Sequence, residues 1–294
     1  MSSLSECIPW MTVGLAESVT IVTFNLCTII VFIRNRNLCK RSMYLVLNLA
    51  VMDMFVGGVA VYDLFYEPGI YCNLWNWPST EVRISIFLLT MLFALGSLIN
   101  ITIIALERVH ATFFPFTHWV LTKWVYRLII TLGWVTSGLV AISLTLLLQF
   151  DSAFHMRYSK ITIISICILI ICVSYTSIVI KVRCGAQPQR HGATSRERKV
   201  TMTLLIVTVV SLLLYLPFII AHYVFLISKF EILESLSVFI HLRNAVLVLI
   251  YSSALVNPIL YAIRMPEYRS ALLAFFSKRP QQQRQIAVFP LRDM

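Results

Sequence analysis

The stretch Tyr44-Leu-Val-Leu-Asn-Leu-Ala-Val-Met-Asp53-Met-Phe-Val-Gly-Gly-Val59 decides the fold, because it places one carboxylate inside an apolar run that reads as part of a membrane span. A charged side chain at mid-membrane costs about 2.5–3.5 kcal/mol on insertion scales. A protein that keeps such a residue usually gives it a polar partner, an ion or a proton to handle. We therefore expect other polar side chains to surround Asp53 inside a helical bundle.

The composition is that of an integral membrane protein. Of the 294 residues, 59% are hydrophobic and 13% are charged, whereas a soluble domain carries roughly 25% charged residues. Apolar runs of at least ~18 residues are long enough to cross a bilayer, and lipid forces each of them to be helical. They lie at 12–34, 43–66, 81–111, 124–149, 158–182, 199–228 and 236–263. The predicted fold is all-α, a seven-transmembrane helix bundle.

The formal charge of +11 comes from basic residues whose distribution among the loops indicates the membrane topology. Alternate loops are rich in Lys and Arg, and the positive-inside rule places those loops in the cytosol. The chain is thus expected to be a multi-pass plasma-membrane protein with its N-terminus outside and its C-terminus in the cytoplasm. Nucleic-acid binding is not expected, because the basic residues are divided among short loops.

The chain is expected to form one membrane domain over residues 1–280, followed by a disordered cytoplasmic tail over 281–294. Residues 266–277 have apolar and basic sides, and Pro266 suits a first helical turn. This segment is predicted to be a short amphipathic helix that lies on the inner membrane surface against the lipids.

Two of the seven cysteines, Cys7 and Cys72, are predicted on the outer side of the membrane. They are the one plausible disulfide pair. Two unpaired thiols fit the sequence nearly as well.

A buried ion pair is predicted at the cytosolic end of the third span. Arg108 follows Glu107 at the end of an apolar helix, and Glu197 heads the sixth span. A salt bridge from Arg108 to Glu197 would tie the inner ends of the two helices together, and breaking it would open a cytosolic cleft. The alternative is an interfacial arginine that extends to lipid phosphates.

Two prolines predict bends in the last two spans. Pro258 follows Asn257 in the seventh span, and Pro217 lies in the sixth; each removes a helix hydrogen bond. Asn257 is expected to face Asp53, and Tyr261 lies about one turn closer to the cytosol, where it could change partner.

These features together resemble the rhodopsin-like (class A) G protein-coupled receptors, and the resemblance covers nearly the whole chain. The short outer loops, with Arg83 at the helix-three cysteine position and Cys167 at the helix-five proline position, are most similar to the melanocortin branch and its lysophospholipid, cannabinoid and adenosine relatives. The matching motifs are Asn25, Leu49-Ala-Val-Met-Asp53, Glu107-Arg108-Val109, Trp134, Tyr175 and Asn257-Pro-Ile-Leu-Tyr261.

The resemblance implies roles for individual residues. A sodium pocket would stabilise the resting state, Arg108 would meet the G-protein α-subunit after leaving Glu197, and Tyr175 and Tyr261 would hold the open state through water. Tyr215 stands where the family has its toggle tryptophan. The implied sodium pocket consists of Asp53, Ser97, Ser253 and Asn257. The implied outer ligand cavity consists of Asp63, Thr90, Met91, Ala94, Phe218, Ile219, His222, Leu247 and Tyr251.

The cavity positions restrict the ligand. Thr90 stands where amine receptors have an aspartate, and Tyr251 stands where opsins have the lysine that binds retinal, so neither an amine nor retinal is expected. The expected ligand is a peptide or a small molecule. For Asp63 a role in the cavity is favoured, whereas Glu67 and Glu81 read slightly better as solvated charges at a helix rim. His222 fits a ligand contact and an interfacial position equally well.

The leading hypothesis is a receptor that transmits an extracellular ligand to heterotrimeric G proteins. A non-signalling receptor-like protein, such as a decoy or heteromer partner, is the alternative, because the usual disulfide is missing and Tyr215 and His110 depart from the family pattern. A transporter is a weaker alternative, because Asp53 stands nearly alone at mid-depth. No nucleophile or metal-ligand constellation suggests an enzyme, and no cofactor is expected besides an allosteric sodium ion.

Overall fold

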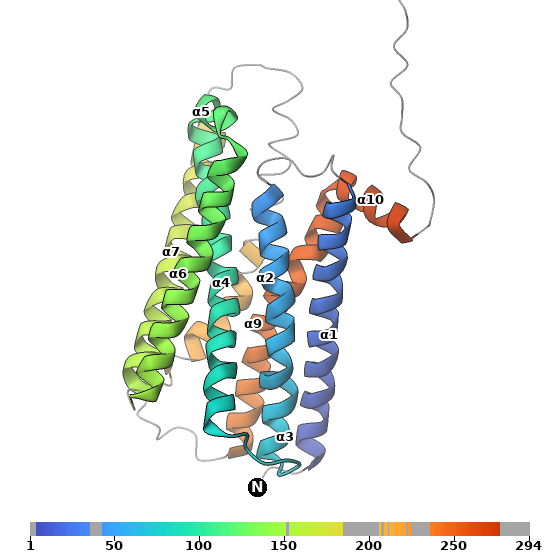
Figure 1. Ribbon diagram of the computed structural model, residues 1–294, viewed down its shortest axis with the longest axis vertical. Coiled ribbons are helices and arrows are strands. Elements are labelled where there is room, and N and C mark those ends of the chain that lie inside the picture. Colours follow the sequence, from blue (N-terminus) through green and yellow to red (C-terminus); the bar gives the residue numbers. More distant parts are fainter. Residues whose placement is uncertain are drawn as a thin grey trace, which may run out of the picture.

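The computed structural model describes residues 4–35, 43–150, 153–184, 206, 209–210, 212–221, 223–224 and 236–276. Every regular element in these ranges is a helix (Figure 1). The prediction of an all-α fold is confirmed.

Six of the described helices are long and apolar enough to cross a membrane. A shorter apolar helical segment, Leu212–Ala221, lies within the predicted span 199–228, and most of the remainder of that span is outside the described residues. The helices stand side by side as a bundle (Figure 1), in agreement with the seven-helix prediction. The six long helices are α1 (Leu4–Arg34), α2 (Met43–Val61), α4 (Thr80–Phe113), α6 (Lys123–Gln149), α7 (Ala153–Cys184) and α9 (Leu236–Arg264).

The second span continues further than predicted. After α2 comes a π-helical turn, η1 (Tyr62–Tyr66), and then α3 (Glu67–Tyr71), whose first turn accommodates Pro68. A wider turn shifts the following residues around the helix axis, by about 100° for one extra residue. The side chains after η1 therefore point in directions that differ from those expected if α2 continued without the wider turn.

Two short helices lie at the same end of the bundle, near the last residues of α4 and α9. They are α5 (Pro115–Val120), between α4 and α6, and α10 (Pro266–Phe276), which turns away from α9 (Figure 1). The prediction of a helix over 266–277 is confirmed as far as Phe276, the last described residue. The Arg34 guanidinium lies 5.1 Å from the centre of the Phe275 ring, so α10 also contacts the last turn of α1. We call this end of the bundle the Arg108 end and the opposite one the Cys7 end.

A disulfide closes the Cys7 end. It joins Cys7 of α1 to Cys72, directly after α3, with a Cα–Cα distance of 6.4 Å that is normal for such bonds. Of the two alternatives that the sequence leaves open for these cysteines, the structure contains the bonded one.

Glycines bring α1 close to the second span. A Cβ atom at Gly14 would lie 2.5 Å from the Leu64 Cβ and 2.6 Å from the Leu64 carbonyl oxygen. Gly57 of α2 meets Ile21 of α1 in a similar way, at 2.8 Å. Membrane helices pack through small residues because lipid provides no hydrophobic driving force between them.

Gly14→Ala is expected to destabilise the bundle, because the new methyl group overlaps backbone atoms that have no room to move. Overpacking of this kind costs about 1–3 kcal/mol. Gly138→Ala on α6 is the matched control, because a Cβ there has nothing within 4 Å. Thermal unfolding of the detergent-solubilised protein should start at a lower temperature for Gly14→Ala only. Equal melting temperatures for the two variants would contradict the close approach of α1 to Leu64.

Candidate functional site

Asp53 is completely buried and joins three helices. Its Oδ1 accepts a hydrogen bond from Ser97 Oγ of α4 at 2.5 Å, and its Oδ2 accepts one from Asn257 Nδ2 of α9 at 2.6 Å. The expectation that polar side chains surround this carboxylate is confirmed. Hydrogen bonds to an ionised group are the strong ones, so this cluster ties α2, α4 and α9 together at mid-bundle.

Ser253 lies beside this cluster but does not bond to Asp53. Its hydroxyl donates to the Ile250 carbonyl at 2.7 Å, and the buried Tyr215 hydroxyl hydrogen-bonds to the Ser253 side chain. The segment Leu212–Ala221 is thereby linked to α9 next to Asp53.

The oxygens around Asp53 suit a hard cation. Asn257 Oδ1 is buried and has no hydrogen-bond partner among the described residues. The Ser97 and Ser253 hydroxyl oxygens keep lone pairs, since each donates its proton elsewhere. Carboxylate, amide and hydroxyl oxygens are the ligands that hard cations take.

A second polar network joins α2, α4 and α6. Asn48 donates to Asn100 Oδ1 at 3.2 Å, Asn100 donates to the Leu45 carbonyl at 3.1 Å, and Trp134 Nε1 donates to Asn48 Oδ1 at 3.0 Å. Of these side chains only Trp134 stood out in the sequence. A polar residue within an apolar run, as at Asn48, was the available signal.

A third link joins α1 to α9. The buried Asn25 donates to the Ala254 carbonyl at 3.1 Å as well as to Ile21 of its own helix at 3.0 Å. The asparagine that resembles the family's first-helix residue therefore holds the two helices together through a backbone oxygen.

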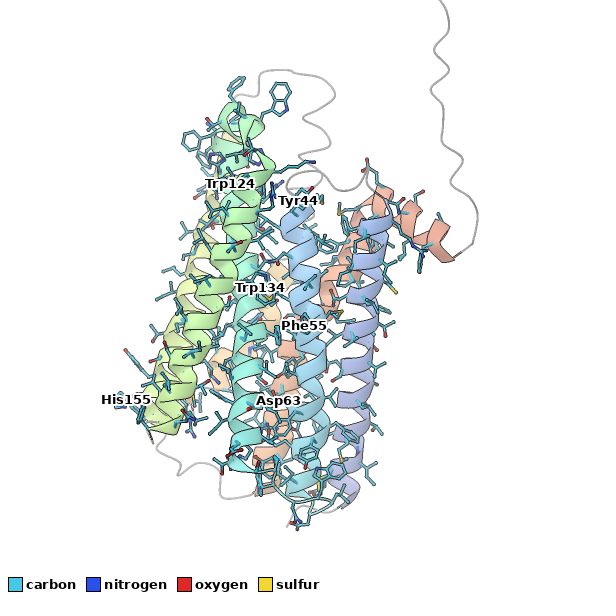
Figure 2. All side chains as sticks on the ribbon, viewed as in Figure 1. Tyr44, Phe55, Asp63, Trp124, Trp134 and His155 are labelled. Carbon is cyan, nitrogen blue, oxygen red and sulfur yellow. A yellow bond between two sulfur atoms is a disulfide. The ribbon has the colours of Figure 1, made fainter. Side chains whose placement is uncertain are left out.

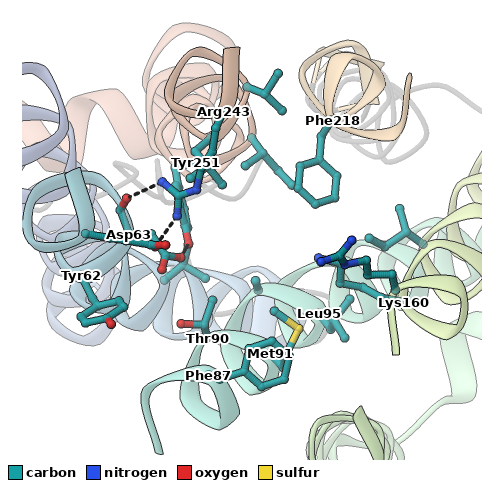
Figure 3. Close-up of a pocket in the computed structure, with 18 of the residues that line it drawn as sticks. Tyr62, Asp63, Phe87, Thr90, Met91, Leu95, Lys160, Phe218, Arg243 and Tyr251 are labelled. Atoms are coloured by element: carbon teal, nitrogen blue, oxygen red, sulfur yellow. Dashed lines mark hydrogen bonds and ion pairs between the residues drawn. The ribbon is translucent and has the colours of Figure 1, made fainter. Parts of the chain in front are cut away.

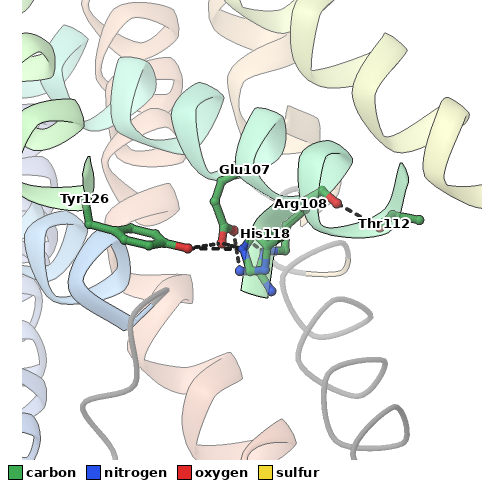
Figure 4. Close-up of polar contacts among 5 residues, drawn as sticks. All are labelled: Glu107, Arg108, Thr112, His118 and Tyr126. Carbon is green, nitrogen blue, oxygen red and sulfur yellow. Dashed lines mark hydrogen bonds and ion pairs between the residues drawn. The ribbon is translucent and has the colours of Figure 1, made fainter. Parts of the chain in front are cut away.

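At the Arg108 end, Glu107 is the centre of a polar cluster (Figure 4). It forms an ion pair with the buried Arg108 guanidinium. It also contacts His118 Nε2 of α5 at 2.8 Å and accepts a hydrogen bond from Tyr126 Oη of α6 at 3.1 Å. Glu197 lies outside the described residues, so its pairing with Arg108 stays a prediction. His118 and Tyr126 were missed in the sequence, where nothing local connects them to Glu107.

Tyr261 of α9 is buried, and its hydroxyl has no hydrogen-bond partner among the described residues. Its ring meets Tyr268 of α10 edge-on, with 6.3 Å between ring centres. Tyr268 in turn shares a 2.8 Å hydrogen bond with Thr28 of α1. Tyr175 is buried on α7, and Pro258 lies within α9, which is one continuous helix on both sides of it.

A large cavity occupies the Cys7 half of the bundle (Figure 3). Its volume is about 1240 Å³. Its wall continues down to Ser97 and Ser253, beside Asp53. Ile219 packs against the core instead of lining the cavity, and His222 is outside the described residues. The expected residues that do line it are Asp63, Thr90, Met91, Ala94, Phe218, Leu247 and Tyr251; Tyr215 and Pro217 line it as well.

The acidic residues of the cavity are bonded to α9. Asp63, within the π-helical turn, accepts a hydrogen bond from Tyr251, and Glu67 forms an ion pair with Arg243. Arg243 also reaches the Asp63 carbonyl at 3.4 Å, and Tyr71 donates to Glu67 at 2.9 Å. The expectation of Glu67 as a solvated rim charge is therefore wrong, because the wider η1 turn and Arg243 bring it into the cavity wall.

The basic residues of the cavity are Arg83, Arg157, Lys160 and Arg243. Figure 3 shows Lys160 across the cavity from Asp63, and its Nζ lies 5.2 Å from the centre of the Phe218 ring. None of these four was assigned to the cavity from the sequence. Lys160 and Arg243 lie within or beside apolar runs, and that was the available signal.

Comparison with known families gives one finding. The family model described as 7 transmembrane receptor (rhodopsin family) matches residues 24–261. The matched range includes Asp53, Arg108 and the Asn257–Tyr261 motif. No curated protein sequence matches the chain.

Trp134→Phe is expected to destabilise the bundle by about 1–3 kcal/mol, because it removes the indole donor and leaves Asn48 Oδ1 without that partner. Trp124→Phe is the matched control on the same helix. Figure 2 shows Trp124 near the Lys123 end of α6, and its side chain is 62% exposed. Thermal unfolding in detergent should separate the two variants; equal loss of stability would contradict the role assigned to the Trp134–Asn48 bond.

Proposed function

Because the chain belongs to the rhodopsin family of seven-transmembrane receptors, we propose that it couples an extracellular ligand to a heterotrimeric G protein at the cytosolic face of the plasma membrane. The observation that carries this proposal is the extent of the cavity. It reaches from Asp63 and Glu67 near the Cys7 end down to Ser97 and Ser253 beside Asp53. A ligand in this cavity lies against side chains that are bonded to the polar centre of the bundle.

Binding in the cavity would act on α9 and on the segment Leu212–Ala221. Phe218 and Tyr251 line the cavity, and the same two elements carry Tyr215 and Asn257, which bond to Ser253 and Asp53. A ligand that prefers another placement of Phe218 or Tyr251 shifts the population of the whole bundle by its difference in affinity. This is the ordinary physical basis of receptor activation.

Asp53, Ser97, Ser253 and Asn257 are the residues that would hold a sodium ion. The ion would supply positive charge beside a buried carboxylate. Since Asp53 already ties three helices, a cation bound there would favour the packing in which these oxygens converge. A packing that separates α9 from Asp53 would lose both the ion and the Asn257 hydrogen bond.

At the other end, the Glu107 cluster would control access of the G protein. Arg108 is ion-paired and buried in this structure, so it cannot meet a partner protein without leaving Glu107. His118 and Tyr126 hold the carboxylate in place from α5 and α6. Release of Arg108 and movement of the Tyr261 hydroxyl, which is without a described hydrogen bond here, would then expose the cytosolic face.

The charges of the chain support one orientation in the membrane. The Arg108 end carries the Lys- and Arg-rich loops of the sequence, and the Cys7 end carries the disulfide, which persists in an oxidising environment. The Cys7 end with its cavity would therefore face the outside, and the Arg108 end would face the cytoplasm.

Asp53→Asn is expected to abolish stabilisation of the purified protein by sodium. In the unaltered chain, sodium at about ten times its Kd should add ~1.4 kcal/mol, by mass action, whereas potassium at the same ionic strength should not. Asp63→Asn, a carboxylate in the cavity wall, should keep the sodium effect. Melting temperatures in NaCl and KCl measure both. A sodium effect that survives in Asp53→Asn would contradict the sodium site.

Glu107→Gln is expected to raise basal nucleotide exchange. Loss of a charge-assisted pair is worth about 1.5–3 kcal/mol, which is about tenfold or more in the population of the open form. The assay is GDP release from a panel of Gα subunits added to membranes that contain the receptor. Glu81→Gln, the same change at an exposed position of the Cys7 end, is the control. No exchange above background from any Gα subunit, with normal surface expression of Glu107→Gln, would contradict the proposed function.

A further inference from the structure

The charges that line the cavity are unequal. Among its described residues, the carboxylates are Asp63 and Glu67, and the basic groups are Arg83, Arg157, Lys160 and Arg243. The ion pair of Glu67 with Arg243 cancels one charge of each sign. Among the described residues that line the cavity, basic groups therefore outnumber carboxylates by two, and this part of the wall carries a net positive charge.

The remaining carboxylate is already held. Asp63 accepts a hydrogen bond from Tyr251, and Arg243 binds its backbone carbonyl. This arrangement counts against a cationic ligand at Asp63, because an ammonium or guanidinium group there would approach Arg243 and face Lys160 across the cavity (Figure 3).

The α7 wall is the part that suits an anion. Lys160 and Arg157 are one turn apart on α7, both are partly buried, and both line the cavity. The Lys160 ammonium lies 5.2 Å from the Phe218 ring centre, at the edge of the apolar part of the wall. Charged side chains in such a setting interact with an anion more strongly than they would in water, because the local dielectric constant is lower.

A second and independent observation comes from α4. Thr90 is 7% exposed and lines the cavity, and its hydroxyl has no hydrogen-bond partner among the described residues. Buried hydroxyls are normally bonded. A polar group of a bound ligand would provide the missing partner. Figure 3 shows Thr90 on the Asp63 side of the cavity and Lys160 on the opposite side.

Most of the remaining described wall is apolar. The cavity of about 1240 Å³ is larger than the ~300–1000 Å³ typical of small-molecule sites, and its described wall contains few polar side chains below Thr90. A cavity of this size and composition favours a ligand with a long hydrocarbon chain that is buried on binding. The apolar residues around it include Leu95, Leu98, Ile164, Phe218, Val246 and Ile250.

We infer that the ligand is an anionic amphiphile, a single apolar chain that carries a carboxylate or phosphate headgroup. Lys160 and Arg157 bind the headgroup, and the chain lies along the apolar wall toward Ser97. This inference rests on the proposed function, since it names the ligand class of the same cavity.

The experiment compares headgroups on one chain. Full-length receptor in nanodiscs of neutral phosphatidylcholine is titrated, below the critical micelle concentration, with oleic acid, 1-oleoyl lysophosphatidic acid, oleyl alcohol and oleylamine. Sodium acetate tests the headgroup without a chain. Saturable thermal stabilisation gives an apparent Kd for each probe. The two acidic probes distinguish a carboxylate headgroup from a phosphate headgroup.

At least one acidic probe is expected to have an apparent Kd at least about tenfold lower than those of oleyl alcohol and oleylamine, because charge-assisted hydrogen bonds are the strong ones. Lys160→Gln should remove most of this preference, Lys160→Arg should keep it, and Arg157→Gln should reduce it. Lys123→Gln is the matched control, because it makes the same change at an exposed position of the Arg108 end. If Lys160→Gln does not fold, Arg157→Gln carries the test.

The inference is overturned if no probe binds saturably, if the alcohol or the amine binds as tightly as the acids, or if acetate matches oleate. It is also overturned if the folded variants keep the full headgroup preference. The binding assay contains no G protein. A preserved headgroup preference with no nucleotide exchange on any Gα subunit would therefore overturn the proposed function and leave this inference standing.

Discussion

The structure depends on a fully buried carboxylate whose two oxygens are bonded to different helices. Asp53 sits on α2, and its partners Ser97 and Asn257 come from α4 and α9. Breaking either bond leaves one carboxyl oxygen without a partner in a medium that does not solvate it, which costs more than a bond lost in water. The cavity extends to this place from one side, and Tyr261 and the Glu107 cluster lie toward the other end. The polar centre is thus the point through which a change at one end of the bundle would have to act.

The helices were predictable because the signal for a membrane helix is local. Apolar runs fixed the six long helices to within a few residues at most of their ends, and Pro266 marked the start of α10. The start of the first span and the end of the second span were predicted least accurately. Helix α1 begins at Leu4 rather than near residue 12, and the second span continues through η1 and α3 to Tyr71. A π-helical turn leaves no signature in hydrophobic periodicity, and Pro68 normally suggests an end rather than a continuation.

The candidate site was predictable only in part. Asp53 stands out as a charge in an apolar run, Asn257 was expected to face it, and Ser97 was implied by the family resemblance. The Glu67–Arg243 pair could not be foreseen, because its members are 176 residues apart and η1 sets the face of Glu67. His118 and Tyr126 contact Glu107 from two other helices, and no local sequence pattern predicts such contacts. The cysteines show the same limit. The predicted topology placed Cys7 and Cys72 on the same side but left free thiols nearly as open as a disulfide, and the structure contains the disulfide.

Helix α1 is attached to its neighbours along its whole length. The Cys7–Cys72 disulfide holds one end, Asn25 holds the middle to the Ala254 carbonyl, and Thr28 and Arg34 hold the other end to α10 through Tyr268 and Phe275. A segment fastened at three levels moves least when the bundle changes shape. Spin or fluorescent labels on the exposed side of α1 would therefore serve as a fixed reference point for measuring displacements of the other helices.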